Sequence, residues 1–190
     1  MQKTTANIEE LYTQYSGRLY HTSLRIVGNT YDAEEIMQDT FIKYYNYPQK
    51  EEIREIQKWL SSICIRKSID VLRARNHNIL TIEEYKETGN NIVIKEEAGF
   101  LINHEQEQEQ EQQHTIKKIK EALATLPDKY RLILSLHLFE GYDYTEIEQI
   151  TGIKEGYIRS LYMRGKAKLA ESLTNTIQEN ERFRTIYKGK

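Results

Sequence analysis

Apolar residues recur at helical spacing through most of the chain, so the hydrophobic pattern predicts an almost all-helical protein. Over residues 8–27 the apolar positions follow a period of about 3.6 residues, and Gly28 ends the pattern. A second helix is expected at Asp32, which has Glu35 three residues later in the spacing of a capping box. A third helix, at about 56–75, has apolar residues around much of its circumference, which predicts a central position in a small bundle.

A second group of helical patterns begins after residue 115. Apolar stripes over 116–126 and 130–139 predict two helices, with Pro127 between them and Gly141 as the stop signal of the second. Pro127 and Gly141 mark the ends of helices rather than of strands. We therefore expect a second small helical domain after the first one.

The stretch after Gly141 has the pattern of a helix-turn-helix. Asp143 and Glu146 are spaced to cap a short helix, and Gly152 can adopt the left-handed conformation of a sharp turn. A second helix is expected from about Glu155, with one apolar face formed by Ile158, Leu161, Gly165 and Leu169. Five lysines and arginines lie between residues 154 and 168, against one glutamate. Such a basic helix fits a DNA major groove, although spacing alone also allows a solvated surface helix.

The segment between the two groups is acidic, and it ends in a tract without apolar residues. Residues 78–114 carry 2 lysines and arginines against 9 aspartates and glutamates, and include the tract HEQEQEQEQQH. This composition is typical of a linker or a solvated helix, and His104 and His114 at its ends are not expected to bind a metal. We predict a first domain at 1–77, an acidic linker at 78–113, a second domain at 114–175 and a C-terminal tail at 176–190.

Charge, cysteine content and motifs exclude several classes of function. The 190 residues have a formal net charge of −2, so the isolated protein should bind duplex DNA weakly. The N-terminus lacks an apolar signal core, no apolar run approaches the ~18 residues of a membrane span, and Cys64 is the only cysteine, which predicts a cytoplasmic protein. Without a phosphate-binding loop, nucleophile elbow or ligand cluster, we expect no catalytic residues, metal or cofactor, and no enzyme.

Three segments together resemble one family. LATLPDKYRLILSLHLFEGYDYTEIEQITGIKEGYIRSLYMRGKAKL resembles region 4 of the extracytoplasmic-function sigma factors, a branch of the bacterial sigma-70 family. YDAEEIMQDTFIKYY resembles region 2.2 of that family, and IQKWLSSICIRKSIDVLRAR resembles regions 2.3–2.4. The resemblance implies an all-α fold in which two small helical domains, a region 2 bundle and a region 4 helix-turn-helix, are joined by a flexible acidic linker.

The resemblance also implies a function and its residues. Such factors bind the clamp helices and flap of the RNA polymerase core and direct it to promoter DNA, and the docking positions of region 2.2 match Glu35, Gln38 and Asp39. Contact with the −10 element is expected from Arg66, Lys67, Arg73 and Arg75, whereas Trp59 is expected in the core. For the −35 element, groove contacts are expected from Arg159, Ser160, Met163 and Arg164, and phosphate contacts from Lys154, Tyr157 and Lys166.

The chain departs from the family pattern at four positions, and its loop before the third helix is about one residue shorter and acidic. One of the four is Leu161, which replaces a frequent arginine. Arg66 occupies a position where the family usually has an asparagine that helps to form a pocket for a flipped base, so a different −10 preference is expected. Glu148 replaces a usual alanine, and Lys154 replaces a usual serine cap.

Partners are also implied by the resemblance. Many relatives are inhibited by a membrane-bound anti-sigma factor, so such a partner is expected here, with the protein a monomer when unbound. The linker either threads into polymerase or acts as a spacer. The alternative hypothesis is a free-standing dimeric helix-turn-helix regulator in which residues 1–77 sense a signal or dimerise.

Overall fold

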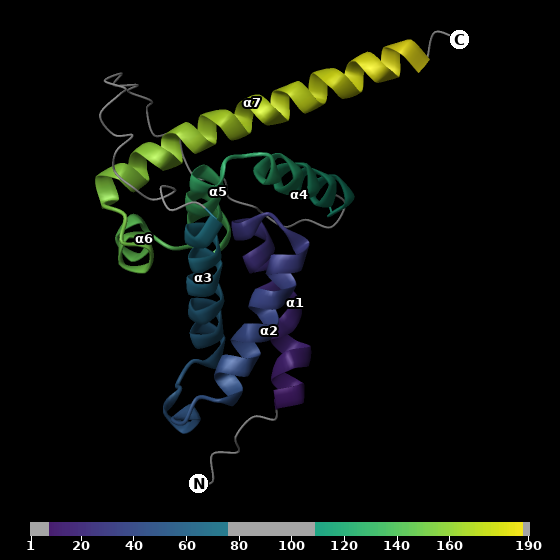
Figure 1. Ribbon diagram of the computed structural model, residues 1–190. Coiled ribbons are helices and arrows are strands. Elements are labelled where there is room, and N and C mark those ends of the chain that lie inside the picture. Colours follow the sequence, from purple (N-terminus) through teal and green to yellow (C-terminus); the bar gives the residue numbers. More distant parts are fainter. Residues whose placement is uncertain (1–7, 76–108, 188–190) are drawn as a thin grey trace.

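The computed structural model describes residues 8–75 and 109–187, with side chains described for 8–75 and 116–174. Every regular element in these ranges is a helix (Figure 1), which confirms the predicted all-α fold. In chain order the elements are α1 (Ile8–Val27), α2 (Thr30–Tyr45), the short turn η1 (Lys50–Glu52), α3 (Ile56–Arg75), α4 (Glu109–Ala124), α5 (Asp128–Leu134), the π-helical turn η3 (Ser135–Phe139), α6 (Tyr144–Thr151) and α7 (Glu155–Tyr187). The predicted linker lies outside the described residues, except for 109–113 at the start of α4. His104 and the side chain of His114 lie outside them as well.

Helices α1, α2 and α3 pack against one another as an N-terminal bundle (Figure 1). Their inward faces carry the apolar periodicity of the sequence, and the most deeply buried side chains include Leu19, Ile26, Leu60, Ile65, Ile69 and Leu72. Complete burial of a side chain of this size contributes about 1.5–3 kcal/mol. Trp59 is half-buried, with ring contacts to Tyr44 and Tyr47, so it packs on the core as expected.

The turn between α1 and α2 has a different cap from the predicted one. Gly28 has φ of +67°, and a Cβ atom at this position would lie 2.9 Å from the Arg131 guanidinium carbon. The side chain of Asn29 caps α2, because its Oδ1 accepts a hydrogen bond from the backbone N–H of Asp32 at 3.1 Å. The expectation that Asp32 is the cap is therefore wrong. Its carboxylate pairs with Arg75 instead.

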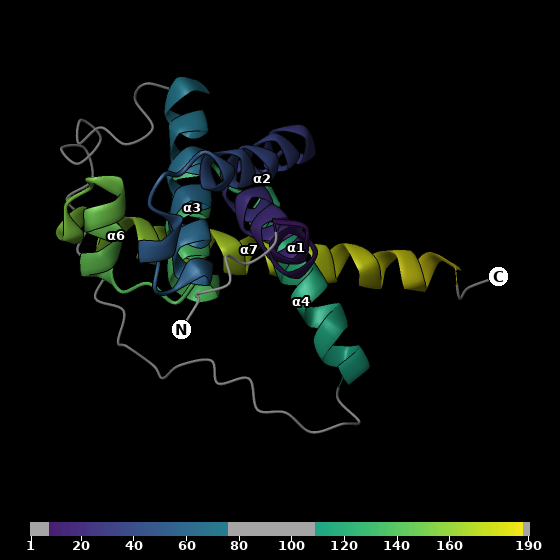
Figure 2. The same ribbon diagram turned by 90° about the horizontal axis from the view of Figure 1, so that it is seen from below.

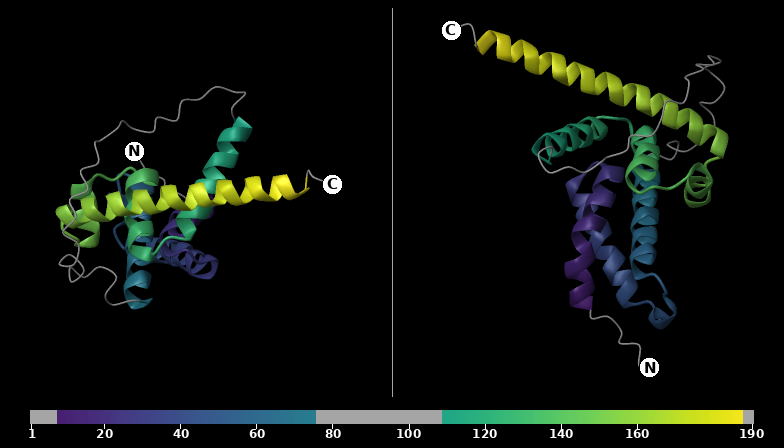
Figure 3. Two further views of the ribbon diagram at one scale, coloured as in Figure 1. Left: turned by 90° about the horizontal axis from the view of Figure 1, so that it is seen from above. Right: turned by 180° about the vertical axis from the view of Figure 1, so that it is seen from behind.

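The C-terminal part, from α5 to α7, surrounds a core of its own. Its most deeply buried side chains include Leu132, Ile133, Leu136, Ile147, Ile158 and Leu161. Gly165 allows α7 to cross α5 closely, because a Cβ atom there would lie 3.2 Å from the side chains of Tyr130 and Leu134. Beyond this crossing, α7 projects past the other helices (Figure 3).

The two bundles are in direct contact. Helix α1 packs on α4, α5 and η3, and α3 packs on α6. Figure 2 shows α3 beside α6. Arg131, only 5% exposed, donates from Nε to the carbonyl of Ile26 at 3.1 Å and from Nη1 to the carbonyl of Leu126 at 2.9 Å. Glu140 accepts from Arg25 at 2.5 Å and pairs with it. Buried polar groups thus hold one bundle against the other.

Candidate nucleic-acid interface

The helix-turn-helix predicted from residues 143–155 is present as α6, a glycine turn and the start of α7. The Asp143 side chain accepts from the backbone of Glu146 at 2.7 Å, and the Glu146 carboxylate accepts from the backbone of Asp143 at 2.8 Å. This is the predicted capping box. Gly152 ends α6 with φ of +72° and a left-handed conformation. These local features set the direction in which α7 leaves the turn.

The start of α7 has a cap that comes from α6. Oε2 of Glu148 accepts a hydrogen bond from the backbone N–H of Glu155 at 3.0 Å. This N–H belongs to the first turn of the helix and has no partner within it. In the sequence, Glu148 and Lys154 are two separate departures from the family pattern. The structure relates them, because a glutamate on α6 provides an acceptor that a lysine at the start of α7 does not.

The candidate groove residues lie on the side of α7 away from the core. Arg159 is exposed, and Ser160, Met163 and Arg164 are partly exposed. All four side chains are thus at least partly accessible to solvent. The groove positions therefore share one helix and its solvent side.

The three candidate phosphate residues divide into two exposed lysines and one buried tyrosine. Lys154 and Lys166 are exposed. Tyr157 is only 5% exposed and belongs to the hydrophobic core. We therefore correct its expected role, because a ring packed inside the protein supports α7 rather than lining its outer surface. Its position four residues before Leu161, on the apolar face, was a sequence signal for burial.

Three of the four cations predicted for the −10 element have intramolecular partners. Lys67 Nζ lies 2.6 Å from Oδ2 of Asp39 on α2, so a predicted −10 residue pairs with a predicted docking residue. Arg73 Nη2 donates to the carbonyl of Thr151 at 2.8 Å, which joins α3 to the end of α6. Arg75 donates from Nη1 to the carbonyl of Val27 at 2.8 Å and also pairs with the carboxylate on the first turn of α2.

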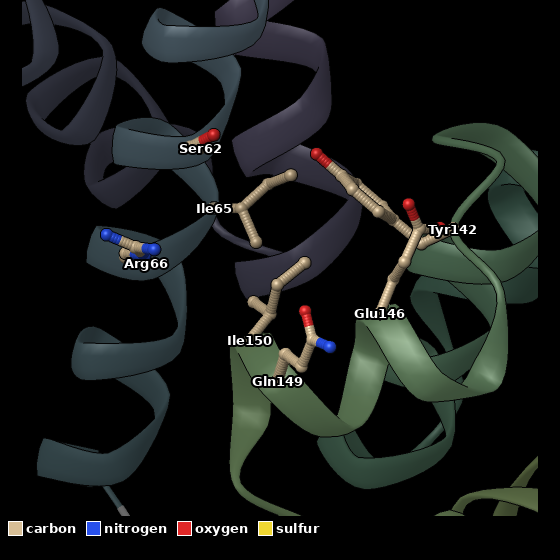
Figure 4. Close-up of a pocket in the computed structure, with 7 residues that line it drawn as sticks. All are labelled: Ser62, Ile65, Arg66, Tyr142, Glu146, Gln149 and Ile150. Carbon is tan, nitrogen blue, oxygen red and sulfur yellow. The ribbon is translucent and has the colours of Figure 1, made fainter.

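Arg66 differs from the other three. It is exposed on α3 and has no ion pair with any residue among 8–75 and 116–174. Beside it is a shallow cleft of about 180 Å³ between α3 and α6, which Ile65 and Ile150 enter from opposite sides (Figure 4). Burial raises the pKa of Tyr142 at this cleft, and the Glu140 and Glu146 carboxylates raise it further. The tyrosine therefore faces the cleft as a neutral hydroxyl.

The outer face of α2 carries a stripe of exposed side chains. Glu35 and Gln38, two of the predicted docking residues, are exposed. Apolar residues with high exposure flank them, at Tyr31 (74%), Ile42 (56%) and Tyr45 (63%). Positions 31, 35, 38, 42 and 45 are spaced by four and three residues in alternation, so they lie along one side of the helix. We call these five residues the α2 stripe.

The stripe was only partly predicted. Asp39, the third predicted docking residue, is beside the stripe and is partly buried. The apolar members were not among the predicted docking residues, although their spacing along α2 was readable from the sequence. Exposed apolar groups that alternate with polar ones are typical of a surface that binds another protein.

Other chemical groups in the described part of the chain offer little reactivity. Burial raises the pKa of the Cys64 thiol to about 12, so this cysteine is neutral at physiological pH. Between residues 8–75 and 116–174, no cluster of three or more histidine, cysteine or acidic side chains is arranged to hold a metal ion. No helix that the structure describes is long and apolar enough to span a membrane.

Family models match both halves of the chain. The model of Sigma-70 region 2 matches residues 11–78, which span α1 to α3. The model of Sigma-70 region 4 matches residues 116–169, which extend from α4 into the first half of α7. The two regions occur in one chain, in this order, on either side of the acidic segment.

Several proteins with similar sequences are ECF RNA polymerase sigma factors. The ECF RNA polymerase sigma factor SigE of Mycolicibacterium smegmatis is 28% identical over 90% of this chain and 63% of its own length, so the chain spans under two thirds of that relative. SigM of Bacillus subtilis, also an ECF RNA polymerase sigma factor, is 22% identical over 85% of this chain and 92% of its own length.

A solved structure has the same fold. It is the sigma factor RpoE of Bartonella quintana in complex with the anti-sigma factor NepR, with 19% identity, a TM-score of 0.53 and coverage of 87% of this chain and 96% of that one. The fold, the two matched regions and their order lead to one conclusion: the chain belongs to the sigma-70 family of RNA polymerase sigma factors, in its extracytoplasmic-function branch.

Proposed function

We propose that this chain binds the RNA polymerase core and directs it to promoters by recognition of a −10 and a −35 element. The observation that carries the proposal is a second basic site. Arg66 is exposed on α3, in a chain whose α7 already offers a basic helix for reading DNA. A regulator that reads DNA with one helix-turn-helix has no need of it. The protein therefore acts by binding polymerase and DNA, and it has no catalytic activity of its own. It acts in the cytoplasm, where polymerase works.

In the proposed complex, α7 enters the major groove of the −35 element. Arg159 and Arg164 are the strongest candidates for contact with bases, with Ser160 and Met163 between them on the helix. Lys154 and Lys166 are positioned to contact phosphates before and after this segment. One good bidentate contact with a base discriminates by about 1–3 kcal/mol. A few such contacts suffice to select a promoter.

The −10 element is assigned to α3, with Arg66 as its principal cation. The other three candidates are engaged within the protein, so contacts that they make with DNA compete with these internal contacts. Arg73 is the clearest case, because its donor Nη2 is bound to the carbonyl of Thr151 in the helix-turn-helix. A contact between Arg73 Nη2 and DNA would therefore compete with this link between α3 and α6.

Polymerase docking is assigned to the α2 stripe. The apolar side chains of Tyr31, Ile42 and Tyr45 supply area that is removed from water on binding, while Glu35 and Gln38 supply polar contacts with a basic partner helix. Aromatic residues are common among the side chains that dominate interface energies. Tyr45 also has Lys50 over its ring at 5.0 Å, which orders it before binding.

An anti-sigma factor is the second proposed partner. The solved Bartonella protein is held in a complex with one, and the family resemblance implies a comparable inhibitor here. A protein that covered the α2 stripe would block polymerase docking directly. Mixing the chain with polymerase core and a candidate inhibitor, and measuring the fraction of core still bound, would identify such a partner.

The test of the main proposal is run-off transcription from a pool of genomic fragments with purified polymerase core. Added wild-type protein should produce new start sites that share two sequence elements. Arg159→Ala should lose the upstream element, and Ile42→Ala should weaken core binding by about tenfold. Thr13→Ala, on the exposed surface of α1, is the matched control and should behave as wild type.

Two results would contradict the proposal. One is an absence of new start sites when wild-type protein is added to an active core. The other is tight, sequence-specific binding of duplex DNA by the protein without core, which is the behaviour of the alternative dimeric regulator. Gel-shift measurements at physiological salt, with and without core, distinguish the two modes of action.

A further inference from the structure

The guanidinium of Arg159 is supported on two sides before any DNA is bound. Oε1 of Glu155 accepts hydrogen bonds from its Nε at 3.1 Å and its Nη2 at 2.6 Å. On the other side, the guanidinium carbon lies 5.0 Å from the centre of the Tyr144 ring. A cation over an aromatic face is attracted to the electron density of the ring. The side chain still remains 58% exposed.

The Tyr144 ring is itself fixed by two other rings. His137 is stacked on it, with centroids 4.8 Å apart and planes 21° apart. Tyr162 lies edge-on to both, at 5.8 Å from Tyr144 and 4.9 Å from His137. The orientation of His137 is fixed in turn, because its Nδ1 donates to the carbonyl of Tyr142 at 2.8 Å. We call His137, Tyr144 and Tyr162 the aromatic support.

The second partner of Arg159 is also anchored outside α7. The hydroxyl of Thr145 on α6 donates to Oε2 of Glu155 at 3.4 Å. The guanidinium therefore contacts Tyr144 of α6 directly and Thr145 of α6 through Glu155, and both of these residues precede the turn at Gly152. As a result, the position of Arg159 depends on how α6 and η3 pack against α7, and not on its own helix alone.

The geometry also selects one edge of the guanidinium. Glu155 takes the edge formed by Nε and Nη2, so the edge formed by Nη1 and Nη2 is the one directed away from this carboxylate. Guanine presents two acceptors, O6 and N7, that match this end-on edge. An arginine that is held before binding loses less conformational freedom when it makes the two bonds.

We propose that Tyr144 is a positioning residue for −35 recognition, which holds Arg159 in the orientation that reads a guanine. The inference rests on the proposed function, since it names the base and the support of one contact in that interface. Neither Tyr144 nor His137 needs to contact DNA. Their contribution is to base discrimination, whereas a purely structural role would change only the amount of folded protein.

The test uses the full-length protein with polymerase core and a pool of duplex DNA in which each position of the −35 region is randomised. DNA that binds is sequenced, and the preference for each base is calculated at every position. Four variants are compared with wild type: Arg159→Ala, Tyr144→Leu, Tyr144→Phe and Tyr12→Leu. The last removes an aromatic ring from the exposed surface of α1 and is the matched control.

Wild-type protein should prefer guanine at one position, and Arg159→Ala should abolish that preference. Tyr144→Leu should lower it by about two- to five-fold at the same position only, which corresponds to the strength of an exposed cation–ring contact. Tyr144→Phe keeps the ring face and should stay within about twofold of wild type. Tyr12→Leu should leave all preferences unchanged. Adding Tyr144→Leu to Arg159→Ala should cause no further loss.

Each contrary outcome has a distinct meaning. If Tyr144→Leu keeps the full preference for guanine, or weakens all positions equally, the positioning role is wrong while the proposed function stands. A preference of Arg159 for a base other than guanine would overturn the assignment of the base. If the wild-type protein with core selects no sequence at all, the proposed function fails, and this inference fails with it.

Discussion

The first turn of α7, which begins the proposed −35 reader, depends on Glu148 of the preceding helix. Its carboxylate accepts the backbone N–H of Glu155 at 3.0 Å, and Lys154, which directly precedes α7, offers no side-chain acceptor. Replacement of Glu148 by alanine leaves this N–H without its partner. It also removes a negative charge from the positive end of the helix dipole. We therefore expect Glu148→Ala to destabilise the protein.

The magnitude follows from two contributions and one offset. Loss of a capping side chain costs about 0.5–2 kcal/mol, and loss of a favourable charge at a helix N-terminus costs about 0.3–1 kcal/mol. The better helix propensity of alanine within α6 returns a few tenths of a kcal/mol. Since the hydrogen bond is partly buried, water restores it only incompletely, so the free energy of unfolding should fall by about 1–2 kcal/mol.

The assay is urea denaturation followed by circular dichroism, with a series of variants that separates the contributions. Glu148→Gln keeps an oxygen acceptor but loses the charge, so its loss should be smaller than that of Glu148→Ala. Lys154→Ser, added to Glu148→Ala, provides a serine cap and should recover most of the loss. Gln149→Ala, an exposed neighbour on α6, corrects for helix propensity. A Glu148→Ala protein within about 0.5 kcal/mol of wild type, the range of ordinary surface substitutions, would refute the reasoning.

Three further predictions concern the interior and the contact between the bundles. Arg131→Met leaves two buried carbonyl oxygens without a donor, so the free energy of unfolding measured in urea should fall by about 2–4 kcal/mol. Glu140→Ala leaves the partly buried Arg25 without its carboxylate, so the free energy of unfolding should fall by about 3 kcal/mol. Hydrogen exchange should accelerate first where α1 meets η3. Uniform acceleration along the chain would contradict this local role. Burial raises the pKa of Cys64 from 9.0 to about 12, so the unfolded thiol ionises first. Stability should therefore fall as pH rises from about 9 to about 12, by about 1.4 kcal/mol per pH unit, and Cys64→Ala should remove this part of the slope.

The elements of the fold were predictable where the signals lie close together in the sequence. The capping box at Asp143 and the turn at Gly152 each involve residues within one turn of a helix, so the sequence determines them almost alone. The cap of α2 was predicted wrongly because two polar residues three positions apart offer the same pattern. Asn29 is the cap because the left-handed Gly28 reverses the chain one turn before Asp32.

The candidate site was less predictable, because its contacts join residues far apart in the sequence. No local pattern indicates that Lys67 pairs with Asp39, or that Arg73 binds the carbonyl of Thr151. Both contacts depend on how helices pack. The burial of Tyr157, by contrast, was readable from its spacing to Leu161 on the apolar face of α7.

The contacts of the α3 cations explain why both reading surfaces would act together on polymerase. Affinity for duplex DNA without regard to sequence grows with the number of phosphates that cations neutralise. On α3, Lys67 and Arg75 are offset by carboxylates of α2, and Arg73 is engaged by the helix-turn-helix. Together with a net charge of −2, this leaves the isolated protein few cations for phosphate. In the proposed complex, polymerase then supplies most of the binding energy, and the few base contacts of this chain decide which promoter is chosen.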